Sequence, residues 1–213
     1  MMKTLFLHPP SYEGFDGGAG SRYQAKREVR SFWYPTWLAQ PAALVPGSKL
    51  IDAPAAGFSL EEVLPMAQGY ELAILHTSSP SFAYDVQVAE ALKKTYPDMK
   101  IGLVGAKVAV APEESLTASP AIDFVAREDF DFTVKEVAEG RPYAEIDGLT
   151  FRDEKGTVVH TPHRPPIEDM DQLPFVTEVY KRDLRVEDYF IGYPWRNVWS
   201  PRWSRGSLPG ARE

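Results

Sequence analysis

Apolar runs of strand length alternate with helix-like segments over the first two-thirds of the chain, and this alternation limits the fold more than any other feature. Each run is closed by glycine, proline or polar residues, as buried strands are. The runs predict strands over residues 3–7, 49–53, 71–75, 100–104 and 122–126. Strands that alternate with helices form a mainly parallel sheet with both faces covered. The sequence therefore predicts an α/β fold, a flavodoxin-like doubly wound parallel sheet of five strands in the order 2-1-3-4-5.

The helix-like segments carry start and stop signals. Ser59, followed three residues later by Glu62, has the form of a capping box at a helix start. Residues 82–96 carry apolar side chains at helical spacing, and Gly140 ends the helix predicted over residues 132–139. A helix entered through proline is predicted within residues 32–45.

The character of the chain changes after residue 140. Residues 148–160 predict a β-hairpin with Gly156 in its turn, and residues 162–174, rich in proline and acid, predict a linker. We therefore expect an α/β domain over residues 1–140, a hairpin and linker over 141–175, and a tail over 176–213 that is truncated or aberrant. Residues 194–213 show no helix cap and no strand alternation, although a linker predicts a second domain after it.

Composition excludes several classes of function. The formal net charge of −7 disfavours a nucleic-acid partner, because phosphate binding needs a positive surface. The chain has no cysteine, so it cannot form disulfides or supply thiolate ligands to zinc or iron–sulfur centres. No apolar stretch approaches the roughly 20 residues of a membrane span, and the N-terminal run is too short for a signal peptide. We expect a cytoplasmic protein with no stable membrane span.

Ligands of open α/β sheets bind beyond the carboxyl ends of the strands. This edge should carry the loops that follow all five predicted strands. Neutral imidazoles can bind metals, hydroxyls can bind polar ligand groups, and glycine lets a ligand approach the backbone closely. The candidate cofactor-binding residues are His8, Pro9, Pro10, Thr77, Ser78, Ser79, Gly105, Ala106, Lys107 and Glu128. No catalytic residue and no metal site are predicted.

Two familiar uses of such an edge fit poorly. A dinucleotide site needs its glycines directly after a strand, but the glycine-rich stretch at residues 17–20 lies too far along the chain. A phospho-receiver needs carboxylates at the ends of the first and third strands, where His8 and His76 stand instead. Hydroxyls, backbone amides and glycine suit a large, mostly neutral cofactor.

Several motifs resemble the N-terminal region of cobalamin-binding radical SAM enzymes. They are Pro9-Pro10 after the first strand, the Tyr34-Pro35 and Gln40-Pro41 pairs, the run Gly148-Leu149-Thr150-Phe151-Arg152-Asp153, and residues 165–175. The longer run over residues 14–41 resembles the hopanoid-biosynthesis-associated radical SAM proteins of the HpnJ family. The resemblance covers about residues 2–193 and implies a corrinoid ligand, cobalamin, at the carboxyl edge. It also implies that the linker joins this domain to a radical SAM barrel.

The chain departs from that family in two respects. It lacks the Asp-x-His-x-x-Gly motif that supplies a cobalt ligand in cobalamin mutases, as radical SAM relatives generally do. It also lacks the cysteine triad that should follow soon after Tyr193, so an iron–sulfur cluster and S-adenosylmethionine are expected only in a full-length relative. The resemblance thus implies the cobalamin-binding domain of an enzyme that makes bacteriohopanetetrol cyclitol ether, with a possible hopanoid substrate. This chain would lack the catalytic half.

Other interpretations stay open. The fold could serve as a non-catalytic interaction module, or as another α/β enzyme such as a nucleotide-sugar transferase. His8 and His76 could approach cobalt, or they could cap their strands by hydrogen bonding to loop backbone. Ser78 and Ser79 could bind the cofactor or cap the following helix, and Glu128 could be a surface carboxylate.

Overall fold

A seven-stranded sheet forms the centre of the computed structural model, which describes residues 1–11, 15–16, 24–25 and 33–189. From one edge to the other its strands are β4 (Lys49–Asp52), β1 (Thr4–His8), β5 (Leu72–His76), β6 (Lys100–Val104), β7 (Phe124–Ala126), β8 (Leu149–Arg152) and β9 (Val158–His160). A separate antiparallel ribbon pairs β2 (Phe15–Asp16) with β3 (Gln24–Ala25). The mixed α/β class agrees with the sequence.

The predicted count of five strands is wrong, because the hairpin joins the sheet instead of hanging from it. Strands β4, β1, β5, β6 and β7 are parallel, whereas β8 pairs antiparallel with β7 and β9 antiparallel with β8. Leu149 is fully buried and Phe151 nearly so. Burying these side chains against the core stabilises the hairpin more than leaving it in solvent would. The predicted boundary at residue 140 therefore falls inside the structural unit that contains the sheet.

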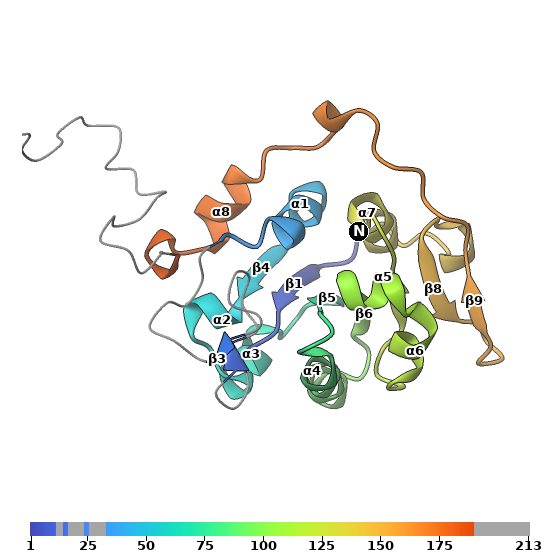
Figure 1. The fold of residues 1–213 in the computed structure, drawn as a ribbon, viewed down its shortest axis with the longest axis horizontal. Coiled ribbons are helices and arrows are strands. Elements are labelled where there is room, and N and C mark those ends of the chain that lie inside the picture. Colours follow the sequence, from blue (N-terminus) through green and yellow to red (C-terminus); the bar gives the residue numbers. More distant parts are fainter. Residues whose placement is uncertain (12–14, 17–23, 26–32, 190–213) are drawn as a thin grey trace, which may run out of the picture.

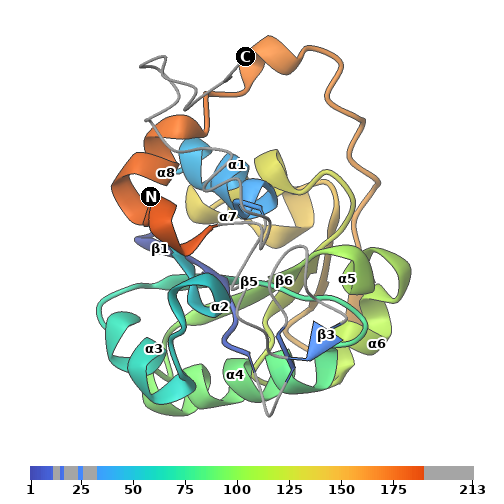
Figure 2. The same cartoon turned by 60° about the vertical axis from the view of Figure 1, so that its left-hand side comes forward.

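Helices cover both faces of the sheet (Figures 1 and 2). On one face, α1 (Thr36–Leu44), α7 (Asp131–Ala138) and α8 (Thr177–Asp183) pack on buried side chains that include Phe6, Ile74 and Phe124. On the other, α3 (Leu60–Met66), α4 (Phe82–Thr95), α5 (Ala106–Val110) and α6 (Pro112–Thr117) pack on Leu7, Leu75 and Leu103. Strand side chains alternate between the faces, so each strand contributes to both cores.

Local signals set several element ends. The Ser59 side chain accepts the Glu62 amide, and the Glu62 carboxylate accepts the Ser59 amide, which confirms the capping box. The short helix α2 (Ala53–Ala56) follows β4 directly and ends at Gly57. The segment Gly105-Ala106-Lys107 ends β6 and also starts a helix, because α5 begins at Ala106. Within the described ranges, no helix is long and apolar enough to cross a membrane.

The chain after β9 crosses the helical face that carries α7 and α1, seen as the orange arc in Figure 1. Apart from a 3-10 turn at Met170–Gln172, residues 162–174 form no regular element. Gln40 donates a hydrogen bond to the Pro174 carbonyl at 3.1 Å, and Arg164 donates one to Glu136 of α7 at 2.7 Å. These contacts anchor the two ends of the segment to the domain.

Helix α8 then docks on the outer edge of the sheet. The Asp183 carboxylate accepts the backbone amide of Leu50 in β4 at 2.8 Å and lies 3.1 Å from the Lys49 ammonium. A 3-10 turn at Val186–Asp188 and Tyr189 follow. The sequence did not predict α8, which belongs to the predicted aberrant tail. The rest of that tail, residues 190–213, lies outside the described residues.

Candidate functional site

The carboxyl edge of the parallel strands gathers most of the predicted site residues. His8 ends β1, Thr77 follows β5 and Gly105 follows β6, on neighbouring strands. The imidazoles of His8 and His76 lie 5.5 Å apart between ring centroids, edge to face. Pro9 and Pro10 are buried, whereas Ser79 is exposed. The ends of neighbouring strands therefore bring these residues together, but only some of them are exposed to solvent.

His8 belongs to a buried network that sequence analysis did not anticipate. The residue is buried, and its Nδ1 lies 2.9 Å from the Oδ1 atom of Asp52, at the end of β4. The Asp52 Oδ2 atom accepts the Tyr189 hydroxyl at 2.7 Å. One carboxylate thus joins the end of β1 to a residue far along the chain.

Trp37 of α1 completes an aromatic group around the two imidazoles. Its ring centroid lies 6.1 Å from that of His8 and 5.3 Å from that of His76. Helix α1 packs over this face of the sheet and so brings the indole to the edge. Of the described residues, no group of three or more His, Asp or Glu side chains could hold a metal ion.

A second buried network underlies the loop after β5. Asp85 of α4 accepts the hydroxyls of Thr77 and Ser81, each at 2.7 Å, and the Ser78 and Ser81 hydroxyls lie 3.0 Å apart. Burial raises the pKa of Asp85 to about 6, although the Thr77 and Ser81 hydrogen bonds oppose that rise. Thr77 and Ser78 are therefore buried and shape the loop, whereas Ser79 is exposed on it.

The Asp85 pKa predicts how stability changes with pH. Because the native pKa of about 6 exceeds the ordinary 3.8, the native state retains a proton that the unfolded state loses between about pH 4 and 6. The free energy of unfolding should therefore fall as pH rises through this window. Asp85→Asn should remove about 1–3 kcal/mol of that fall, measured by urea unfolding at pH 4.5, 5.5 and 7.

Two comparisons make this pH test specific. Burial and the charge of Asp129 also raise the pKa of Asp131 to about 6. Any fall in the free energy of unfolding that persists in Asp85→Asn should therefore come from Asp131. Asp98→Asn, which changes an exposed carboxylate before β6, should leave the pH profile unchanged. An Asp85→Asn profile identical to that of the wild type would contradict the assignment.

Gly105 occupies the closest backbone approach at this edge. Its φ of +112° lies in the region that favours glycine. A Cβ atom there would stand 2.4 Å from the Thr77 carbonyl oxygen and 2.9 Å from the His76 Nε2 atom. Only glycine lets the ends of β5 and β6 come this near. The close neighbours of Gly105 are thus Thr77 and His76 of the chain itself, whereas the approach of a ligand to Gly105 stays a prediction.

Helix α5 presents small and apolar side chains beside Gly105. Ala106 and Ala109 are exposed, and Val110 is 86% exposed. Lys107 points its ammonium to Glu114 at 2.9 Å and lies 5.1 Å from the Phe82 ring centroid. Lys107 therefore links α5 to α6 and to the start of α4. The exposed residues of α5, Ala106, Ala109 and Val110, carry no charge.

Glu128 lies farther along the same edge, two residues after the end of β7. Its φ of +54° is the one positive φ of a non-glycine residue within the described part of the chain. Its carboxylate lies 2.7 Å from Nδ1 of His163, in the segment after the hairpin. The preceding residue, Arg127, is buried and donates to the Thr161 carbonyl at 2.6 Å. Such a backbone conformation is uncommon outside glycine and is often found at functional sites.

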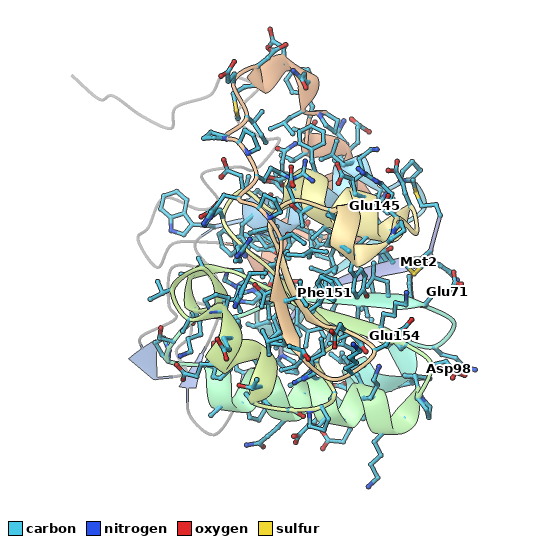
Figure 3. The ribbon with its side chains drawn as sticks, turned by 90° about the vertical axis from the view of Figure 1, so that its right-hand side faces the viewer. Met2, Glu71, Asp98, Glu145, Phe151 and Glu154 are labelled. Carbon is cyan, nitrogen blue, oxygen red and sulfur yellow. The ribbon has the colours of Figure 1, made fainter. Side chains whose placement is uncertain are left out.

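Two cavities lie elsewhere. One of about 470 Å³ is at the amino ends of the strands, where Met2, Glu71 and Asp98 lie along one side in Figure 3. The other, of about 410 Å³, lies between Phe132 and the segment after Arg164. No predicted site residue lines either of them. Strand direction and side-chain chemistry, rather than concavity, identify the carboxyl edge as the candidate site.

The residues that sequence analysis missed are Trp37, Asp52, Asp85 and Tyr189. Asp52 carried a signal, because it stands at the end of a predicted strand beside the one that ends in His8. Asp85 is spaced four residues from Ser81, the reach of one helical turn. Nothing in the sequence pointed to Tyr189, which lies 137 residues from its partner Asp52.

Sequence comparison finds two curated relatives. An uncharacterized methyltransferase of Pyrococcus horikoshii is 28% identical over 183 residues, which cover 82% of this chain and 38% of that protein. The anaerobic magnesium-protoporphyrin IX monomethyl ester cyclase of Rubrivivax gelatinosus is 25% identical over 186 residues, covering 81% and 32%. The chain thus spans about a third of the length of these relatives. No protein-family model matches it.

Structure comparison gives a consistent result. The cobalamin-dependent S-adenosylmethionine radical enzyme OxsB, solved with aqua-cobalamin and S-adenosylmethionine bound, aligns with a TM-score of 0.59 at 11% identity. A second OxsB structure, with aqua-cobalamin bound, gives 0.58 at 12% identity. Both alignments cover 78% of this chain and 23% of that enzyme. The chain therefore shares the fold of one part of a cobalamin-dependent radical enzyme.

Proposed function

We propose that this chain is a cobalamin-binding domain whose cofactor lies on the carboxyl edge of a flavodoxin-like sheet. The observation that carries the proposal is the surface formed by Gly105, the exposed Ser79 and helix α5. A corrin ring is broad and largely apolar, with polar amides at its rim. An uncharged surface that includes Val110, 86% exposed, beside a hydroxyl and close-packed backbone suits such a ring.

Several features of the described residues support this proposal. Gly105 lets the ends of β5 and β6 lie close together beneath the proposed floor, because any side chain there would collide with Thr77 and His76. The Asp85 hydrogen bonds hold Thr77 and Ser81, and so fix the loop that carries Ser79. His8, Pro9 and Pro10 would support the floor from below, and Glu128 would accept hydrogen bonds from corrin amides. Bound cobalamin supplies a cobalt centre that can carry an alkyl group.

We further propose that the domain serves a larger radical SAM enzyme of hopanoid biosynthesis, of the HpnJ family, acting on a hopanoid substrate. The resemblance over residues 14–41 supports the hopanoid role, and the fold shared with OxsB supports the link to a radical SAM enzyme. The 213 residues have no cysteine, so an iron–sulfur cluster bound by thiolates would need another polypeptide segment. Chemistry with S-adenosylmethionine would belong to that segment.

Hydroxocobalamin binding tests the proposed site directly. We expect the purified protein to retain hydroxocobalamin through desalting, with an absorption spectrum that differs from that of the free corrinoid. Val110→Asp should weaken binding about tenfold, because a charge on the floor would have to be desolvated beneath the ring. The fold should not change, since Val110 is exposed.

Phe175→Asp is the matched control for that variant. Phe175 is 89% exposed on the linker, so the same exchange of an exposed apolar residue for a carboxylate should leave binding intact. A folded wild-type protein that takes up no corrinoid would refute the proposal and favour the non-catalytic interaction module. Equal affinity in Val110→Asp and the wild type would exclude α5 from the floor.

A further inference from the structure

The buried carboxylate of Asp52 has two partners that come from opposite ends of the described chain. Its Oδ1 atom lies 2.9 Å from Nδ1 of His8, and its Oδ2 atom accepts the Tyr189 hydroxyl at 2.7 Å. The Asp52 and His8 side chains are 1% and 5% exposed, so water does not compete for these bonds. Hydrogen bonds to a carboxylate in such surroundings are short and strong.

This arrangement fixes the chemistry of the His8 ring. A carboxylate accepts hydrogen bonds and cannot donate them, so Nδ1 of His8 carries the hydrogen. The neutral ring then has its lone pair on Nε2. The edge-to-face contacts with His76 and Trp37 further limit how the ring can rotate. One tautomer and one orientation of His8 follow from these contacts.

Tyr189 acts on the same carboxylate from the other side. Burial, together with the negative charge of Asp52, raises the Tyr189 pKa well above its usual range, so its hydroxyl stays protonated and donates. Its ring lies 4.5 Å from that of Tyr34, which stacks at 4.5 Å on Tyr180 of α8. Tyr189 is thus held in place independently of the hydrogen bond that it makes.

We infer that Tyr189 is a positioning residue for the carboxyl edge: through Asp52 it sets the orientation and proton affinity of His8. The segment after α8 is then part of the candidate site, although Tyr189 lies 137 residues from Asp52 in the sequence. This inference builds on the proposed cobalamin site, since His8 lies at the edge where the cofactor would bind. Without the Tyr189 hydroxyl, the Asp52 carboxylate would interact more strongly with the His8 ring.

Two measurements on Tyr189→Phe test the inference. By NMR, the His8 ring should titrate at higher pH than in the wild type, because Asp52 would have lost a competing donor. The groups facing His8 among the described residues are Asp52, His76, Tyr189 and, through its charge, Asp85. Asp52→Asn should shift the same titration downward, because it removes the charge. Hydroxocobalamin affinity should fall about threefold to tenfold in Tyr189→Phe, the effect of one lost hydrogen bond.

Tyr180→Phe provides the matched control. Its hydroxyl lies 2.7 Å from that of Thr36 in the same aromatic stack but does not touch Asp52, so the His8 titration should stay as in the wild type. Identical His8 titrations in Tyr189→Phe and Tyr180→Phe would overturn the inference. A wild-type protein that binds no corrinoid would refute the proposed function alone, and the titration would still decide the role of Tyr189.

Discussion

Gly105→Ala is expected to abolish retention of hydroxocobalamin and to lower the free energy of unfolding by about 2–4 kcal/mol. Two effects add at this position. The φ of +112° is strained for any residue with a side chain, and the new methyl group would stand 2.4 Å from the Thr77 carbonyl oxygen. Relief of that contact must separate the ends of β5 and β6, which form the proposed floor. Desalting with absorption spectroscopy and urea unfolding measure the two outcomes.

Gly140→Ala separates the backbone strain from the steric contact. Gly140 also has a positive φ, +84°, but a Cβ atom there would meet nothing within 4 Å. It follows α7, at the opposite end of the strands from the proposed site. This variant should lose about 1 kcal/mol of stability and keep its affinity for hydroxocobalamin. If Gly105→Ala behaved in the same way, close packing at β5 and β6 would have no part in binding.

Gly102→Ala should lower the free energy of unfolding by about 3 kcal/mol through overpacking of the core. Gly102 is paired with Phe124 between β6 and β7, and an added Cβ atom would lie 2.3 Å from the Phe124 ring. Phe124 is fully buried and contacts the Tyr143 ring at 5.3 Å, so it has little room to move. Urea unfolding would measure the loss.

A second substitution gives this prediction its internal check. Phe124→Leu alone should cost about 1–2 kcal/mol, because it leaves a cavity. Combined with Gly102→Ala, the smaller side chain makes room for the new methyl group. The double variant should therefore lose less stability than the sum of the single losses, with a coupling of about 1–2 kcal/mol. Strict additivity would mean that the two residues do not compete for the same space.

The strands were predictable because they are buried on both faces. Residues 100–104 match β6 residue for residue, and the ranges predicted for β1 and β5 are each displaced by only one residue. Parallel central strands read as continuous apolar runs, so their position needs no knowledge of their neighbours. The capping box was predictable for a similar reason, because its two partners lie three residues apart.

Elements that depend on distant contacts were not predictable. Helix α8 has one buried residue, Val179, so it shows no apolar periodicity, and its docking depends on Asp183 meeting β4. The hairpin itself was predicted correctly, but its pairing with β7 depends on which edge of the sheet is open to it. A sequence shows which residues can pair locally, whereas tertiary packing decides which edges meet.

The candidate site likewise combines residues that were predictable from sequence with partners that were not. Strand ends placed His8, Thr77 and Gly105 at one edge from sequence alone. The partners that orient those residues come from elsewhere: Asp52 lies 44 residues from His8, and Tyr189 lies 137 residues from Asp52. Asp85, eight residues from Thr77, is nearer, but its effect depends on burial that only the folded chain reveals.

The Asp183 contact with β4 has a consequence for self-association. An outer strand offers unpaired amides to any other chain that can add a strand, which is a common route to aggregation. The Asp183 carboxylate occupies the Leu50 amide, and α8 lies against β4. The opposite border of the sheet is the three-residue strand β9, too short to template a long intermolecular ladder. Both borders are thus poor templates for unwanted pairing, one because a side chain covers it and the other because it is brief.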